Sequence, residues 1–215
     1  MGMRRKVAAL AVTLTAGAAA VAFTVGPAKA DTVIDASYPV TGTTHINSTD
    51  SDLTLGPATM TAAIDLSDSP AQITGSMSLP PSTGSFDLIG FVPVTATVAF
   101  VPVGQVTGSL VSGVLTEGEI SATAHYTIQL TDLKVAGVDV AAGPACETVT
   151  PASITVTSPT DFNAVEGGTL TGTYTIPDFK NCGPLGSETW LINDVIPGSG
   201  NTISLDLGTP TLSAG

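Results

Sequence analysis

The stretch ISATAHYTIQLT at residues 120–131 alternates apolar and polar side chains, and this pattern decides the predicted fold. Ser, Thr, His or Gln separates the apolar positions, which are Ile120, Ala122, Ala124, Tyr126, Ile128 and Leu130. Successive side chains of a β-strand point to opposite faces of a sheet, so a period of two residues is typical of a strand with one buried face. Residues 120–131 are therefore predicted to form a strand whose apolar face lies against the core.

Shorter alternating segments occur elsewhere along the chain. They lie at residues 60–66, 73–79, 106–110, 170–176 and 203–207. Gly and Pro separate these segments, and Thr, Ser and Val are abundant, which favours strands and turns over helices. We predict one all-β domain over residues 31–215, an Ig-like, Greek-key β-sandwich of about a dozen short strands without a helix.

One segment, at residues 88–103, is almost wholly apolar and does not alternate. Pro93 and Pro102 interrupt it and β-branched residues dominate it, so it is predicted to form strands buried on both faces at the centre of the sandwich. A sharper hypothesis is that it faces lipid or lines a site for an apolar ligand. The candidate lining residues are Phe91, Val94, Val98 and Phe100.

Two pairs of segments resemble each other. Residues 57–61 (PATMT) resemble residues 151–155 (PASIT), and residues 73–80 (ITGSMSLP) resemble residues 170–177 (LTGTYTIP). The offsets are 94 and 97 residues, and the matches keep their order. This pattern suggests a duplicated β unit.

The N-terminal residues 1–30 have the organisation of a cleavable signal peptide. Basic residues at 4–6 precede an uncharged apolar stretch at 7–25, and Ala-Lys-Ala follows at 28–30. This order predicts secretion with cleavage after Ala30. A transmembrane anchor is disfavoured because the apolar stretch consists largely of small residues. We therefore expect a secreted protein with no transmembrane anchor after cleavage.

Cleavage would leave a strongly acidic chain without arginine. Two basic residues, Lys134 and Lys180, would remain against 18 acidic residues, a formal net charge of −16. Neutralising phosphates requires Lys and Arg, so nucleic acid is excluded as a partner, and anionic lipid surfaces are disfavoured for the same reason.

The two cysteines, Cys146 and Cys182, are predicted to form one structural disulfide. An even number of cysteines in an exported chain is typical of disulfide pairing. The alternative is a redox-active pair, but such cysteines usually stand two residues apart at a helix start.

Few residues are suited to catalysis or metal binding. The histidines, His45 and His125, lie among Thr and Ser, and the usual hydrolase and zinc motifs are missing. No cofactor is expected, although oxygen atoms of Asn47, Asp50 and Asp52 could hold Ca²⁺. This loop lacks the Gly and the distant Glu of an EF-hand.

Several runs resemble small secreted proteins of high-GC Gram-positive bacteria such as the streptomycetes. The runs lie at residues 133–138, 168–177, 182–183 and 196–202. The resemblance implies export, a β fold and one disulfide, and it brings no activity and no site residue.

The leading functional hypothesis is a secreted, non-catalytic binding or structural module, extracellular or associated with the cell envelope. The first alternative is a carrier of an apolar small molecule or lipid. A Ser–His–Asp site needs no fixed spacing, so a secreted hydrolase using His45 or His125 is the second alternative.

Overall fold

A computed structural model of the chain describes residues 33–88, 91–139 and 146–214. The predicted signal peptide at residues 1–30 lies outside the described residues. The helical elements are η1 (Pro184–Gly186) and α1 (Thr189–Val195). The strands are β1 (Val33–Ile46), β2 (Ser51–Asp65), β3 (Gln72–Ser78), β4 (Ser82–Leu88), β5 (Val92–Pro102), β6 (Val106–Val114), β7 (Glu117–Val135), β8 (Val138–Asp139), β9 (Glu147–Thr148), β10 (Ala152–Thr157), β11 (Gly168–Ile176), β12 (Phe179–Lys180), β13 (Gly198–Leu207) and β14 (Thr211–Ala214).

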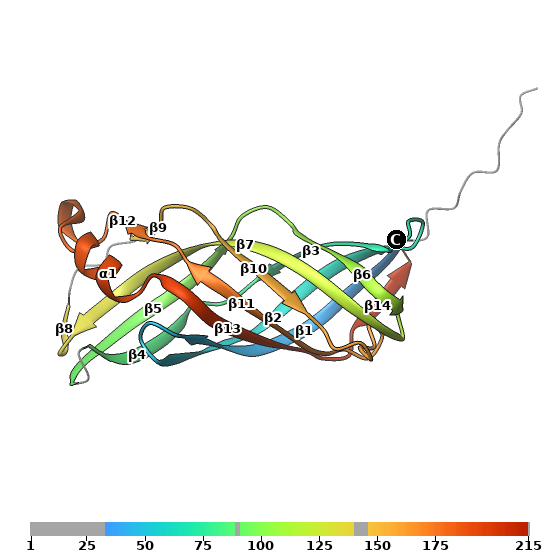
Figure 1. Cartoon of the computed structure of the whole chain (residues 1–215), viewed down its shortest axis with the longest axis horizontal. Helices are drawn as coiled ribbons and strands as arrows, with labels where there is room; N and C mark the ends of the chain where they lie inside the picture. Colours follow the sequence, from blue (N-terminus) through green and yellow to red (C-terminus); the bar gives the residue numbers. More distant parts are fainter. Residues whose placement is uncertain (1–32, 89–90, 140–145, 215) are drawn as a thin grey trace, which may run out of the picture.

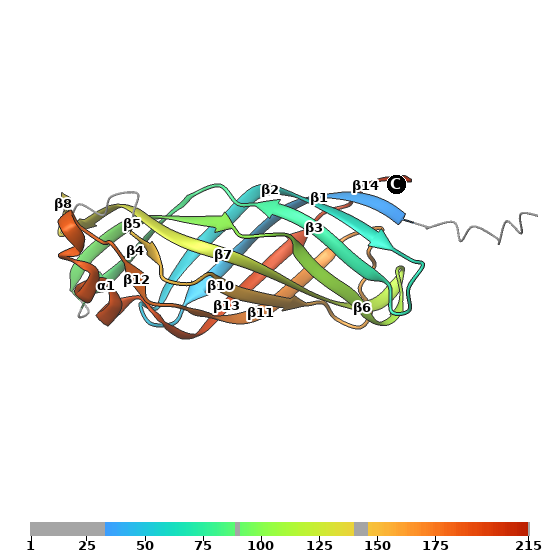
Figure 2. The same ribbon diagram turned by 90° about the horizontal axis from the view of Figure 1, so that it is seen from above.

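Eight of these strands form a closed antiparallel ring. Its order is β1, β2, β3, β6, β7, β10, β11 and β13, and β13 pairs with β1 to close it. The strands run obliquely along the long axis of an elongated molecule (Figures 1 and 2). Closing a sheet in this way pairs strand edges that would otherwise attract other chains.

The strand predicted from residues 120–131 is the middle of β7, the longest strand of the described sheet, with 19 residues. Its first half pairs with β6 and β10, and its second half continues past them to pair with β5, β8 and β9. The predicted alternation is confirmed, since Tyr126, Ile128 and Leu130 are buried and His125 is exposed.

The predicted all-β class is confirmed. The interior holds one apolar core with the halves of the ring on opposite sides of it, which resembles a sandwich. The connectivity differs from the Greek-key order expected for an Ig-like sandwich, because all strands belong to one sheet and neighbours in the ring follow in chain order. Alternation along a strand specifies its buried face but not its neighbour, so the pattern could not distinguish these arrangements.

The suggested duplication has a counterpart in strand pairing. Met60 pairs with Met77 between β2 and β3, and Ile154 pairs with Tyr174 between β10 and β11. These four residues occupy corresponding positions of the two sequence repeats, so the two hairpins have the same register. Each set of four ring strands also has an insertion before its last strand, β4–β5 in one and β12–α1 in the other. Both insertions lie at the same end of the molecule (Figure 1).

The apolar segment at residues 88–103 does not lie at the centre of the fold, which corrects that prediction. Most of it is β5, which joins β4 and the second half of β7 beyond the ring. Buried and less buried positions alternate over its first half, so one face is covered. High apolarity therefore does not mark burial on both faces here, and Val101 and Val103 are exposed.

Three buried tyrosines connect elements across the interior. The hydroxyl of Tyr38 donates to the Ala164 carbonyl at 2.7 Å, and that of Tyr174 shares a 2.8 Å hydrogen bond with the Thr44 hydroxyl. Burial raises the pKa of both tyrosines and raises the pKa of Tyr126 to about 12. The interior is therefore apolar enough to disfavour a phenolate.

The residue pattern predicted no helix, and α1 corrects this. An isolated helix of seven residues is unstable in water, so α1 depends on packing against the sheet and gives little local signal. Within the described ranges, no helix combines the length and apolar character needed to cross a membrane.

Candidate functional site

The most elaborate part of the molecule is the end that carries α1, which we call the α1 end. It consists of α1, η1, β8, β12 and the start of β5 (Figure 1). The inner face of α1, with Ile192 and Val195, lies over Phe86 of β4 and Val94 of β5 and encloses a cavity of about 20 Å³ with them. The helix therefore covers the apolar interior at this end.

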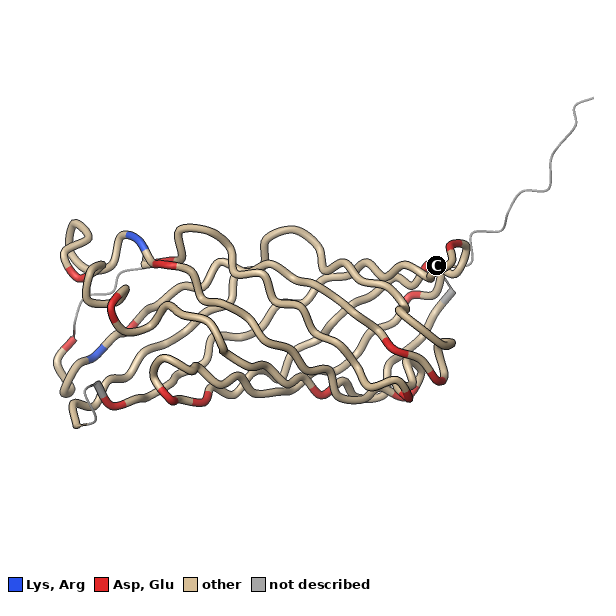
Figure 3. The backbone as a smooth tube through the Cα atoms, viewed as in Figure 1, with Lys and Arg blue, Asp and Glu red and all other residues tan. Residues whose placement is uncertain are grey.

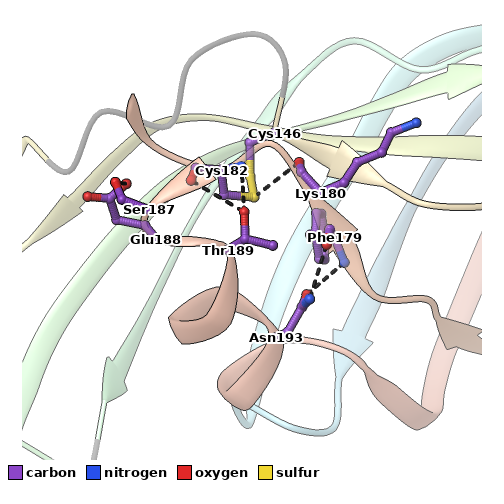
Figure 4. The surroundings of a disulfide bond; sticks show 8 residues. All are labelled: Cys146, Phe179, Lys180, Cys182, Ser187, Glu188, Thr189 and Asn193. Carbon is purple, nitrogen blue, oxygen red and sulfur yellow. Dashed lines mark hydrogen bonds between the residues drawn. A yellow bond between two sulfur atoms is a disulfide. The ribbon is translucent and has the colours of Figure 1, made fainter. Parts of the chain in front are cut away.

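A disulfide and two polar side chains hold α1 in place (Figure 4). The predicted Cys146–Cys182 bond is confirmed, and both cysteines are fully buried. The Thr189 hydroxyl accepts a hydrogen bond from the Cys182 backbone N–H at 3.0 Å. The Asn193 side chain accepts from the Phe179 N–H at 2.7 Å and donates to the Phe179 carbonyl at 3.0 Å. Helix and disulfide therefore form one connected unit.

An ion pair adds a further contact beside the disulfide. Lys180 Nζ lies 3.2 Å from Glu147 Oε1, and Gln129 Nε2 donates to Glu147 Oε2 at 3.2 Å. The hydrogen bond from Gln129, followed by the contact with Lys180, lowers the pKa of Glu147 below its ordinary value of 4.5. Both contacts favour the charged carboxylate, so they stabilise the fold only while Glu147 is ionised.

This pair predicts a specific acid dependence. Because the pKa of Glu147 is lower in the folded state, its stabilisation is present above about pH 4.5 and is lost as the pH falls through the folded pKa. Glu147→Gln is expected to lower the melting temperature at neutral pH, and this difference is expected to shrink as the pH falls below 4.5. The control is Glu117→Gln, which removes an exposed carboxylate from β7. A difference for Glu147→Gln that persists unchanged at pH 3 would contradict the assignment.

The α1 end also exposes apolar side chains. The four most exposed large apolar side chains of the described chain are those of Phe91, Val138, Leu185 and Trp190. Phe91 is 74 % exposed and Trp190 is 72 % exposed. They belong to the residue before β5, to β8, to η1 and to α1, and these elements lie at the same end of the molecule (Figures 1 and 2). Exposed apolar groups at one end of a molecule are candidates for an interaction site.

The four predicted ligand-lining residues are not brought together. Val98 and Phe100 line one cavity of about 40 Å³ inside the sheet, whereas Val94 lines the smaller cavity beneath α1. Phe91 precedes β5 and projects into solvent instead of lining a cavity. Positions two residues apart do share a face in β5, but Val94 lies nearer to the α1 end than the other two inward-facing residues.

The residues proposed for calcium make other contacts. Asp50 Oδ1 lies 3.6 Å from His45 Nε2, and Asp52 Oδ1 lies 3.0 Å from His45 Nδ1, so both carboxylates are paired with one histidine. The amide nitrogen of Asn47 donates to the Ser199 carbonyl at 3.4 Å. Within the described residues, no three His, Cys, Asp or Glu side chains are grouped closely enough to hold a metal ion.

The two histidines lie on the outer surface, far apart in the ring. His125 is exposed on β7 opposite Ser153 of β10. His45 of β1 and its partner Asp52 line a shallow groove of about 770 Å³ across the outer face of β10, β11 and β13. Threonine supplies most of the other side chains of this groove. The geometry thus pairs His45 with two carboxylates, those of Asp50 and Asp52, at an open site.

The sequence pattern did not single out Val138, Leu185 or Trp190. Val138 and Leu185 stand next to Gly, and Trp190 stands in a short apolar run between Thr189 and Asn193, where so few apolar residues carry little information. The available signal was the single Trp of the chain, which follows a Gly- and Pro-containing stretch.

No protein family, characterised protein or solved structure matches this chain.

Proposed function

We propose that this protein is a non-catalytic module that works outside the cytoplasm and attaches to an apolar layer of the cell envelope through the α1 end. The observation that carries the proposal is the exposure of Phe91, Val138, Leu185 and Trp190 on elements that all lie at one end of an elongated molecule. The disulfide supports a location outside the reducing cytoplasm.

The form of the α1 end favours a lipid–water interface as the surface bound. The apolar side chains stand on separate short elements at the tip, as in proteins that insert a few residues below lipid headgroups. Trp and Phe are suited to such an interface, since their rings are large and tolerate a partly polar environment. Both lysines of the described chain, Lys134 and Lys180, also lie at this end (Figure 3). They are paired with Asp139 and Glu147, which reduces the repulsion that unpaired carboxylates would meet near a headgroup layer.

The proposal predicts binding to zwitterionic vesicles. Trp190 is the only Trp of the sequence, so its fluorescence reports directly on the α1 end. We expect its emission maximum to shift to shorter wavelength with phosphatidylcholine vesicles and the protein to sediment with them. Burying a Phe or Leu side chain contributes roughly 1.5–3 kcal/mol, so the double variant Phe91→Ser/Leu185→Ser is expected to weaken binding by about tenfold or more.

The matched control is Val111→Ser/Val114→Ser, which removes two exposed apolar side chains from β6, near the opposite end of the molecule. This variant is expected to bind vesicles like the parent protein. An unshifted Trp190 spectrum at millimolar lipid, or equal losses in the two double variants, would refute attachment through the α1 end.

A further inference from the structure

Two neighbouring rows of outward-facing hydroxyl side chains cross the ring, and we call them the hydroxyl rows. The strand register places one residue of each row on each of five adjacent strands, β13, β11, β10, β7 and β6. All of these positions hold Thr or Ser. The first row is Thr202, Thr173, Thr155, Thr123 and Thr107, and the second row is Ser204, Thr171, Thr157, Ser121 and Ser109.

The hydroxyl rows form a regular array of hydrogen-bonding groups. Neighbouring strands of a sheet lie about 4.7–4.9 Å apart, and residues two positions apart on one strand are separated by about 6.4–6.8 Å. Each hydroxyl can donate one hydrogen bond and accept two. The array carries no charge, although the chain as a whole is strongly acidic. Its chemistry is therefore that of closely spaced neutral donors and acceptors.

The groove of about 770 Å³ lies over part of this array, on β10, β11 and β13 (Figure 1). Thr43 of β1 pairs with Ser204, so it extends the second row into the groove by one further strand. A volume of about 300–1,000 Å³ is usual for ligand sites. Because the groove lies on the outer surface, a long chain can enter it without a change in the fold.

A second groove, of about 470 Å³, lies on the outer face of β1, β2, β3 and β14. Its lining includes the hydroxyl residues Thr61, Thr74 and Ser76. The sequence repeats align these positions with three residues that line the first groove, Thr155, Thr171 and Thr173.

Strand pairing agrees with this alignment of the two grooves. Thr61 lies opposite Ser76 between β2 and β3, and Thr155 lies opposite Thr173 between β10 and β11. The two hydroxyls of the β2–β3 pair are 2.9 Å apart. Both sequence repeats therefore carry a hydroxyl-lined groove at the same position.

We propose that the two grooves bind a neutral polysaccharide. Sugar hydroxyls donate and accept hydrogen bonds in the same way as the hydroxyls of Thr and Ser, and the Thr methyl groups can contact the C–H groups of sugar rings. An anionic polymer would need Lys or Arg to offset its charge, and neither groove is lined by such a residue. Lys134 and Lys180 are paired with carboxylates at the α1 end.

The composition of the grooves favours a long chain over a short one. Among the described residues, no Phe, Tyr or Trp lines either groove, so the large flat contacts that these rings offer are missing. Each hydrogen bond to a sugar replaces one to water and contributes little by itself. A polymer makes many such contacts at once and can engage both grooves of one molecule or of neighbouring molecules, which raises the overall affinity.

The grooves are separate from the residues proposed for surface attachment. They lie on strands along the side of the elongated molecule, whereas α1, η1 and β8 lie at one end of it (Figure 1). One molecule could therefore contact an apolar layer with its tip and a polysaccharide with its side. Neither contact requires the other.

The test measures depletion of the purified protein from solution by amorphous cellulose and by chitin, two neutral insoluble polysaccharides. We expect saturable binding to at least one of them. An insoluble carboxymethyl derivative of cellulose has the same backbone with negative charge, and we expect it to bind the protein about tenfold more weakly or less. Cellotriose at millimolar concentration is expected not to displace the protein from the polymer.

Hydroxyl-deletion variants locate the binding. Thr155→Ala/Thr173→Ala alters the first groove, and Thr61→Ala/Ser76→Ala alters the second. Each double variant is expected to weaken binding by about threefold or more, and their combination by about tenfold or more. If the first variant does not fold, Thr157→Ala/Thr171→Ala removes the next pair of hydroxyls from the same groove.

The matched control is Thr116→Ala/Thr150→Ala, which removes two exposed hydroxyls outside both grooves. It is expected to bind like the parent protein. Three results would overturn the proposal: no saturable binding of the folded protein to either neutral polymer, equal losses in the groove and control variants, and equally tight binding of the carboxymethyl derivative. Because none of these variants alters the tip of the α1 end, vesicle binding and polysaccharide binding can fail separately.

Discussion

Replacing Phe179 with alanine is expected to lower the free energy of unfolding by about 3–5 kcal/mol, the usual cost of truncating a buried phenylalanine. The Phe179 side chain is 2 % exposed and lines the cavity of about 40 Å³ inside the sheet. Its backbone is the part of β12 to which Asn193 of α1 is hydrogen-bonded. The truncation therefore enlarges a cavity and removes packing beneath the segment that covers the interior. Urea denaturation followed by circular dichroism measures the loss.

Phe91→Ala is the matched control, since it removes the same atoms from a side chain that is 74 % exposed. Its effect on stability is expected to stay within about 0.5 kcal/mol. Similar losses for the two variants would mean that Phe179 does not pack in the core as described.

Removal of the disulfide is expected to have the second large effect. The bond joins residues 36 positions apart, and the loop-entropy relation gives a loss of roughly 3–4 kcal/mol for Cys146→Ala/Cys182→Ala. The bond also connects β9 to the segment that leads into η1 and α1, so its loss should loosen the cover of the interior. Denaturation midpoints of the variant and the oxidised parent protein measure the difference.

A measurement on the parent protein refolded under reducing conditions distinguishes the effect of the crosslink from that of sulfur packing. The reduced protein keeps both cysteine side chains, so its free energy of unfolding should fall by most of the amount lost in the double variant. Equal midpoints for the oxidised and reduced proteins would show that the crosslink does not stabilise the fold. A loss in the double variant alone would assign the effect to packing.

The local parts of the fold were predictable because each depends on a short pattern. The alternation at residues 120–131 indicated β7 and its buried face, and the similarity of residues 57–61 and 151–155 identified strands that occupy matching registers. The position of residues 88–103 was predicted wrongly because a high apolar content indicates burial but does not indicate which elements cover the segment. The helix α1 was missed because it depends on contacts with β4, β5 and β7, which are distant in sequence.

The candidate sites were less predictable than the fold. The Cys146–Cys182 bond followed from simple pairing, since only two cysteines are present. Val98 and Phe100 line one cavity, whereas Phe91 is exposed beside the start of β5.

The sequence by itself determined the strand character of this protein, the face that each strand buries, the acidic charge and the single disulfide. These properties depend on residue type and on spacing over a few positions. Only the tertiary structure decided that the strands close into a ring in chain order and that the elements carrying four exposed apolar residues lie at the α1 end. The physical reason is that such proximities arise from the path of the whole chain, because each brings together side chains that lie tens of residues apart.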